Sequence, residues 1–272
     1  MGAAGSPPSA PLVGRLGEVA SLYFCMDDFS HLAGVSHGML EPLEKRLLAT
    51  VDAVVSTARS LTESKVPARG QAHYLPQGVN YDHFARPREE PTELAGLPRP
   101  LIGFAGAVSE CCDLGLIRAV AEAHPGGSVV LVGPITGPTD GLDLPNIHIL
   151  GARPYRDLPA YVQRFDVGLI PYLLNEWTRA VDPLKLLEYL AAGVPVVSTA
   201  LPEAYKYEEV VTIARDRAAF LGGVSSALAV DPTRRDRGRA VARSNTWADR
   251  ARTFLDILDA IVERRSQLSG AA

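Results

Sequence analysis

A lysine and a glutamate stand three positions apart in a segment that is otherwise largely apolar. The segment Asp182 to Val197 reads DPLKLLEYLAAGVPVV, and its two central charges are Lys185 and Glu188. Helical periodicity spreads leucine and alanine over most of the surface and leaves both charges in one narrow gap. An unpaired buried charge is costly, so the pattern indicates either an i, i+3 ion pair at a solvent edge or two ligand contacts.

The ends of this helix are marked by the residues around it. Asp182 is a good N-cap, and Pro183 fits the first helical position. Gly193 suits a left-handed C-terminal turn, and Pro195 prevents the helix from continuing. The sequence therefore predicts a helix over 182–192, followed by the buried strand VPVV.

The loop before this helix carries polar side chains. They are Asn175, Glu176, Thr178 and Arg179. A helix N-terminus with cationic side chains nearby is a natural binding site for a diphosphate. We expect this loop to face the start of helix 182–192.

Three further positions follow predicted strands. Gly103 and Gly106 are expected after the strand PLIGFAG, where they allow a phosphate close to the backbone or simply form a tight turn. The segment GFAG lacks the GxGxxG fingerprint of dinucleotide sites. Arg153 follows the strand NIHILG and can either stack on a base or cap a surface.

Strands and helices alternate along the chain and must position these residues. Three strands are expected near Leu22, Val54 and Tyr74, and the run QGVNYDHFARPREEPTELAGLPRP marks a boundary. Beyond it, continuous apolar strands alternate with helices up to a final helix over about 247–264. This pattern indicates an α/β fold with a doubly wound parallel sheet, whose ligands bind at the carboxyl ends of the strands.

Composition excludes several classes of protein. The chain has 272 residues, of which 47% are hydrophobic, and its net charge of −4 gives no electrostatic footprint for nucleic acid. Its three cysteines indicate a reducing cytoplasm, and no apolar run is long enough to span a membrane. The expected location is cytoplasmic, with the inner face of the membrane as an alternative. The sequence does not predict an oligomeric state.

Six segments together resemble the GT-B glycosyltransferases of family 4, the "group 1" enzymes, near bacterial teichuronic acid and exopolysaccharide members. The segments are YFCMDDFS, EKRLLATVDAVVSTARSL, LPQGVNYDHF, LIGFAGAVSE, NEWTRAVDPLKLLEYLAAGVPVVST and NTWADRA. The resemblance implies two Rossmann-like domains. Residues 1–88 are the second half of an N-terminal, acceptor-side domain, and 89–98 are a linker. Residues 99–245 are a complete nucleotide-sugar-binding domain, and 246–268 a helix that crosses back to the first domain.

The resemblance also implies an activity. Glu188 is similar to a glutamate that holds the donor ribose, and Lys185 is similar to a diphosphate ligand. Catalytic candidates after the first predicted strand are Asp27, Asp28 and His31. The implied reaction is a retaining sugar transfer from a nucleotide-diphosphate-sugar to a polysaccharide or lipid-linked acceptor, with peripheral contact to the membrane and no metal or cofactor.

Several features depart from the family pattern. A second glutamate expected eight positions before Glu188 is replaced by Ala180, and Cys111 and Cys112 stand in a loop that often carries a basic residue. The first strands of the family have no counterpart, so the sequence is expected to be N-terminally truncated, with an exposed sheet edge and a partly bare face. A non-catalytic nucleotide-sugar-binding module is the alternative function, and an epimerase on the same fold is a third.

Overall fold

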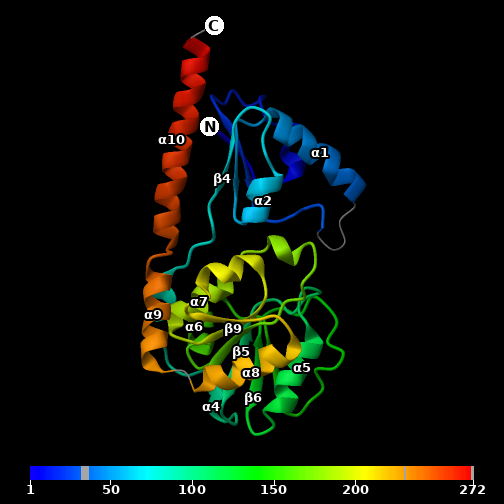
Figure 1. The fold of residues 1–272 in the computed structure, drawn as a ribbon, viewed down its shortest axis with the longest axis vertical. Coiled ribbons are helices and arrows are strands. Elements are labelled where there is room, and N and C mark those ends of the chain that lie inside the picture. Colours follow the sequence, from blue (N-terminus) through cyan, green and yellow to red (C-terminus); the bar gives the residue numbers. More distant parts are fainter. Residues whose placement is uncertain (32–36, 230, 271–272) are drawn as a thin grey trace. The chain divides into compact units, whose positions relative to one another are not determined.

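The computed structural model describes residues 1–31, 37–229 and 231–270 (Figure 1). Their contacts group them into two compact units. Unit 1 comprises Met1–Gln77, Asn175–Asp182 and Trp247–Ala272, and unit 2 comprises Gly78–Leu174 and Pro183–Thr246.

Unit 1 contains a four-stranded parallel sheet in the order β1-β2-β3-β4. The strands are β1 (Gly2–Ala4), β2 (Ser21–Cys25), β3 (Ala53–Ser56) and β4 (Gln71–Tyr74). The three predicted strands are confirmed, but β1 is an addition that the sequence did not predict. Its residues, Gly-Ala-Ala, lack β-branched side chains and alternation, so only the pairing with β2 identifies it.

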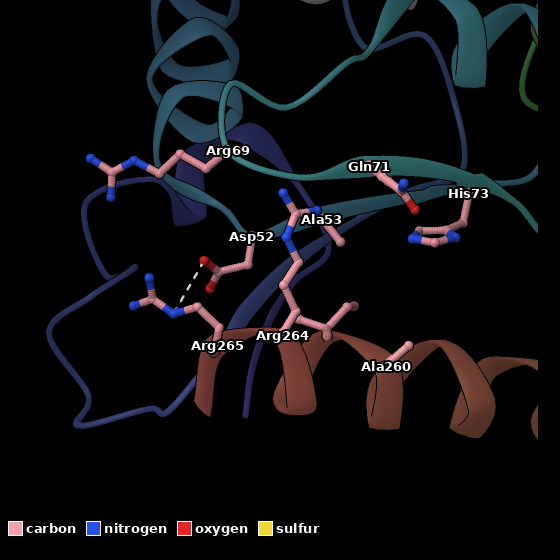
Figure 2. A pocket seen from close by; sticks show the side chains of 9 residues that line it. Asp52, Ala53, Arg69, Gln71, His73, Ala260, Arg264 and Arg265 are labelled. Atoms are coloured by element: carbon pink, nitrogen blue, oxygen red, sulfur yellow. Dashed lines mark ion pairs between the residues drawn. The ribbon is translucent and has the colours of Figure 1, made fainter. Parts of the chain in front are cut away.

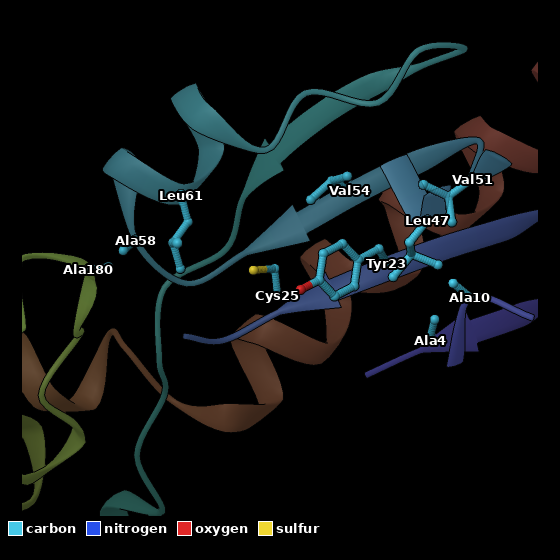
Figure 3. Packing of buried hydrophobic residues seen from close by; sticks show 10 residues of the cluster. All are labelled: Ala4, Ala10, Tyr23, Cys25, Leu47, Val51, Val54, Ala58, Leu61 and Ala180. Carbon is cyan, nitrogen blue, oxygen red and sulfur yellow. The ribbon is translucent and has the colours of Figure 1, made fainter. Parts of the chain in front are cut away.

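Helices cover both faces of this sheet. Tyr23 of β2 packs with Leu47 of α1 (His37–Thr50) in the cluster drawn in Figure 3, which also includes Leu61 of α2 (Arg59–Ser64). The neighbouring Leu22 points to the other face and belongs to a cluster with Ile261 of α10 (Trp247–Gly270). The expectation of a partly bare face was therefore wrong, because α10 packs there. Two 3-10 helices, η1 (Pro7–Ser9) and η3 (Thr178–Ala180), complete the unit.

Unit 2 contains a six-stranded parallel sheet in the order β10-β9-β8-β5-β6-β7. The strands are β5 (Leu101–Ala105), β6 (Ser128–Val132), β7 (Ile147–Gly151), β8 (Val167–Ile170), β9 (Val196–Thr199) and β10 (Val211–Ala214). The order proceeds outward in both directions from β5, which confirms the predicted doubly wound sheet. Ligands of such sheets bind where the strand order reverses, between the carboxyl ends of β5 and β8.

The helices of unit 2 include several that the sequence did not predict. The helices of this unit are α3 (Tyr81–Ala85), α4 (Thr92–Ala95), α5 (Leu114–Ala123), η2 (Tyr155–Asp157), α6 (Leu158–Val162), α7 (Leu184–Ala192), η4 (Pro202–Tyr207), α8 (Arg217–Leu228) and α9 (Pro232–Arg243). Those that were not predicted include α3, α4 and α9. The longest of these is α9, whose run RRDRGR gives almost no apolar stripe. It packs on α7, where a Cβ on Gly238 would lie 2.9 Å from Leu190.

The division between the units differs from the predicted boundaries. It falls after Gln77, whereas the sequence predicted residue 88. The predicted linker 89–98 contains α4, whose Leu94 is fully buried, and belongs to unit 2. The segment 175–182 lies inside the predicted second domain but groups with unit 1. Contacts with residues far away in the chain decide to which unit these segments belong, and the composition of a segment does not reveal such contacts.

Candidate functional site

The carboxyl ends of β5 and β6 approach each other closely in unit 2. The Gly106 amide donates to the Val132 carbonyl at 2.8 Å. A Cβ on Gly133, which has φ +154°, would lie 2.0 Å from the Gly106 carbonyl oxygen. Gly133 is therefore required by close backbone contact, whereas a side chain on Gly106 would meet only the flexible end of Lys185.

Lys185 extends from α7 across this glycine turn. A Cβ on Gly106 would lie 1.8 Å from the Lys185 Cε and 2.8 Å from its Nζ. The Nζ lies 5.9 Å from the ring centroids of both Phe104 and Tyr172, a weak cation–π arrangement. No ion pair or hydrogen bond engages its ammonium within the residues that the structure describes. The charge is thus held at the carboxyl edge of the sheet by apolar neighbours.

Glu188 lies on the same helix and is buried, with 7% of its surface exposed. Burial raises the pKa of its carboxyl group to about 7, and the positive charge of Lys185 opposes that rise. Among the described residues its carboxylate accepts no hydrogen bond and forms no ion pair. The alternative of a surface i, i+3 ion pair with Lys185 is therefore wrong. A buried acceptor without a partner is the arrangement expected where a ligand supplies the donors.

The start of α7 differs from the sequence prediction. The helix begins at Leu184, Pro183 is its N-cap residue, and no side chain caps its amide groups. The Asp182 carboxylate accepts instead from the Gln77 amide at 2.8 Å, within unit 1. The uncapped N-terminus carries the positive end of the helix dipole close to Lys185. Gly193 ends the helix at φ +76°, as predicted.

Tyr155 is a residue of this site that the sequence analysis missed. Its ring stacks on His83 with centroids 4.7 Å apart and planes inclined by 23°. Half of its surface is exposed, and burial of its hydroxyl together with the charge of Glu188 raises its pKa. It follows Arg153 by two positions, and an aromatic residue shortly after the strand NIHILG was the available signal.

A second polar cluster follows β2 in unit 1. Asp28 lies 2.9 Å from the His31 Nδ1 and 3.3 Å from the Lys65 Nζ, and Lys65 also pairs with Glu44 at 2.7 Å. The Tyr23 hydroxyl donates to Glu44. Asp28 and His31 were predicted from the sequence, but Glu44 of α1 and Lys65, the C-cap residue of α2, were not, because neither position has a local signal of a polar partner.

The two aspartates of this cluster have different environments. Burial alone would raise the pKa of Asp28, but hydrogen bonds from Ser30 and His31 and the charge of Lys65 lower it to about 2. Burial raises the pKa of Asp27, and the indole of Trp177 opposes that rise. Asp28 therefore holds a stable negative charge beside His31, whereas Asp27 takes up a proton more readily.

Residues 99–229 match the family described as "Glycosyl transferases group 1". This segment belongs to that family. It comprises the strands β5 to β10 together with Lys185 and Glu188, so the candidate site of unit 2 lies within a group 1 domain.

A curated relative extends the likeness beyond this segment. The chain is 28% identical over 228 residues to the "Putative teichuronic acid biosynthesis glycosyltransferase TuaH" of Bacillus subtilis. The alignment covers 77% of the chain but 57% of the relative, so the chain spans little more than half of the relative's length.

Solved structures share the fold. An α,α-trehalose-phosphate synthase (UDP-forming) from Burkholderia vietnamiensis superposes with a TM-score of 0.71 at 17% identity, over 95% of this chain and 70% of the other. A sucrose-phosphate synthase from Thermosynechococcus elongatus gives 0.74 at 18% identity, over 99% and 74%. The predicted GT-B fold class is thereby confirmed.

Two predicted ligand residues of the group 1 domain have structural partners instead. Gly103 lies within β5, not after it, and a Cβ there would meet the Phe165 ring at 2.2 Å. Arg153 donates to the Tyr161 hydroxyl at 2.9 Å, pairs with Glu93 at 2.6 Å and also binds two carbonyl oxygens. Arg153 therefore caps the surface, which is one of its two predicted alternatives.

The polar loop before α7, residues 175–182, groups with unit 1, whereas the rest of the matched segment 99–229 groups with unit 2. The Asn175 Oδ1 accepts from the Thr178 amide at 2.8 Å, and Glu176 lies 3.7 Å from Arg179 on an exposed surface. Ala180 belongs to the core cluster of unit 1. Buried Thr178 and Ala180 anchor the loop in unit 1. That its polar side chains face the start of helix 182–192 stays a prediction.

Cys111 and Cys112 are free and buried in the group 1 domain. A hydrogen bond from Cys112 lowers the pKa of Cys111, with a further contribution from Lys185. Over the described residues, no group of three His, Cys, Asp or Glu side chains could hold a metal ion. Among the same residues, no helix has both the length and the apolar character that a membrane span requires.

Proposed function

We propose that the group 1 domain binds the nucleoside diphosphate of a nucleotide-sugar and that the whole protein is a retaining glycosyltransferase. The observation that carries this proposal is Glu188, a buried carboxylate with no partner among the described residues, on the same helix as Lys185. A buried charge of this kind is costly unless a ligand supplies hydrogen bonds.

The chemistry of the site fits the three parts of such a donor. The two hydroxyls of a ribose are donors that a carboxylate such as Glu188 can accept together. Lys185 and the first amides of α7, which no side chain caps, suit the diphosphate. The exposed ring of Tyr155, beside Glu188, offers an apolar face to the base.

Transfer requires the nucleoside diphosphate to leave the anomeric carbon with both electrons of the bond. Cationic and amide groups placed at the phosphates stabilise the negative charge that then develops on the leaving oxygen. Lys185 and the N-terminus of α7 are the groups of unit 2 with these properties. The resemblance to group 1 enzymes supports retention of configuration without a metal, with no cofactor beyond the donor.

The acceptor is proposed from the relative alone. A protein described as a putative teichuronic acid biosynthesis glycosyltransferase favours a cell-surface polysaccharide or a lipid-linked acceptor. Asp27, Asp28 and His31 of unit 1 are the groups proposed on the acceptor side. The Asp28–His31 pair suits that role, because a carboxylate that stays ionised fixes the orientation of the imidazole.

A non-catalytic nucleotide-sugar-binding module is the second candidate. Its supporting observation is that Lys185 and Glu188 both lie in unit 2, so the candidate donor site does not need the groups of unit 1. Both candidates require the same donor site, so binding by itself does not separate them. Release of free nucleoside diphosphate in the presence of a lipid-linked or polysaccharide acceptor does.

The donor site is tested by calorimetry and thermal shift with UDP-, GDP- and dTDP-sugars. At least one of them is expected to bind and to raise the melting temperature. Glu188→Gln should weaken binding about tenfold or more, because charge-assisted bonds to two hydroxyls are lost. Glu209→Gln is the matched control, since Glu209 is exposed in the same unit. Equal affinities for the two variants would overturn the assignment of Glu188.

A further inference from the structure

A cavity of about 320 Å³ lies in unit 1 at the opposite edge of the sheet from the Asp28–His31 cluster. It is lined by the first residues of two strands, Ala53 of β3 and Gln71 of β4, and by α10. Figure 2 shows the cavity from close by. Because the sheet is parallel, the amino ends of its strands share this edge, and Asp28 follows the carboxyl end of β2.

Three arginines line the cavity, and only one has a carboxylate partner among the described residues. Arg265 lies 3.4 Å from Asp52, as the dashed line in Figure 2 marks. The Asp52 carboxylate also accepts hydrogen bonds from the amide and the hydroxyl of Ser21. Arg69 and Arg264 form no ion pair or hydrogen bond within the described part of the chain. The wall therefore carries an excess of positive charge.

The backbone brings these charges together. A Cβ on Gly70 would lie 1.7 Å from the Asp52 carbonyl oxygen, so a glycine is required where Arg69 passes the start of β3. Figure 2 shows Arg264 rising from α10 toward Ala53, with Asp52 on one side and His73 on the other. Burial lowers the pKa of His73, so at neutral pH it adds a neutral hydrogen-bonding group.

We propose that this cavity is a second binding site, separate from the candidate donor site, for a ligand that bears a phosphate group. A guanidinium stays charged at every accessible pH and matches phosphate oxygens in a bidentate geometry. The cavity volume is at the lower end of that for small-molecule sites, which suits a small phosphorylated molecule or the headgroup of an anionic phospholipid. Like charges gathered at one wall repel each other, and an anion removes that repulsion.

The test uses inorganic pyrophosphate as the probe and the full chain carrying Lys185→Gln, so that the candidate donor site does not contribute. Calorimetry compares Arg69→Gln/Arg264→Gln in this background with the control pair Arg15→Gln/Arg46→Gln. The control arginines are exposed in the same unit, and their replacement changes the net charge equally. We expect the first pair to weaken binding about tenfold or more relative to the control, and binding to weaken with added salt.

Two further measurements complete the test. Arg264→Lys keeps the charge but loses the bidentate geometry, so it should weaken pyrophosphate binding while leaving the fold unchanged. Sedimentation with vesicles containing phosphatidylglycerol distinguishes the sources: a lipid headgroup predicts co-sedimentation that pyrophosphate reverses, and a soluble ligand predicts pyrophosphate binding alone. Equal affinities for the arginine pair and the control pair, or no binding at millimolar pyrophosphate, would overturn the proposal.

Discussion

At the scale of single residues, the proposed function rests mainly on Glu188 and Lys185. One is a buried acid without a partner, and the other is an ammonium group held among aromatic rings. Neither arrangement stabilises the free protein well, since each charge is partly removed from water. Both are understandable if a ligand completes the site.

Glu188 should make the stability of unit 2 depend on pH. Its folded-state pKa is about 7 against an ordinary value of 4.5, so the folded state is penalised wherever the carboxyl is ionised in the unfolded chain. The penalty is absent below 4.5, grows between 4.5 and about 7, and is complete above that. Glu188→Gln is therefore expected to be more stable than the wild type near pH 8, with the difference disappearing near pH 5. Urea unfolding followed by circular dichroism measures this, and a difference independent of pH would contradict it.

Gly106 should matter through Lys185. A methyl group on Gly106 would occupy the position of the Lys185 Cε and force the lysine side chain to move. Gly106→Ala is expected to weaken binding of a nucleoside diphosphate by about 1.5–3 kcal/mol, the value of a hydrogen bond to a charged group. Lys185→Met should have the same effect, and the double variant should add little to it. Additive effects, measured by calorimetry, would show that the glycine acts independently of the lysine.

At the scale of elements, β5 and its turn contain two glycines with different functions. Gly103 lies in the strand against the buried Phe165, whereas Gly106 lies beyond the strand, under Lys185. From the sequence, both glycines were expected after the strand, close to a phosphate or in a tight turn. The end of the strand decides which glycine faces the core, and the sequence does not locate that end.

Gly103→Ala is therefore expected to affect folding more than binding. The added methyl would overlap the Phe165 ring, and overpacking of a core typically costs about 1–3 kcal/mol of unfolding free energy. Gly222→Ala in α8 is the matched control, because no atom lies within 4 Å of the position where its Cβ would be. Chemical denaturation compares the two; a Gly103→Ala protein as stable as the control would refute the assignment.

At the scale of the whole molecule, unit 1 is assembled from three separate segments of the chain. Its sheet is covered on one face by α1 and α2 and on the other by α10. Both tryptophans of the chain, Trp177 and Trp247, belong to this unit, so tryptophan fluorescence reports on unit 1 alone.

Ile261→Ala should therefore destabilise unit 1 selectively. Ile261 is 6% exposed and packs against the sheet from α10, and loss of such a side chain costs about 2–5 kcal/mol. The fluorescence transition is expected to move to lower denaturant, while nucleotide binding by unit 2 persists where unit 1 is already unfolded. Simultaneous loss of both signals would show instead that the units unfold together.

Features that depend on neighbouring residues were predicted correctly from the sequence. Apolar runs without alternation predicted the buried strands of a parallel sheet, and Gly193 predicted the left-handed end of α7. The spacing of Lys185 and Glu188 in an apolar helix indicated the candidate donor site. Each of these depends on residues only a few positions apart.

Features that depend on distant contacts become visible in the folded chain. In the folded chain Arg153 pairs with Glu93, residues 175–182 group with unit 1, and three arginines line one cavity. The Asp182 carboxylate accepts a hydrogen bond from the Gln77 amide instead of capping the start of α7. The partners in these contacts lie far apart in the chain, and a charged or polar side chain looks the same in sequence whether its partner is protein, ligand or water. Packing chooses among them, because burial makes an unsatisfied polar group costly.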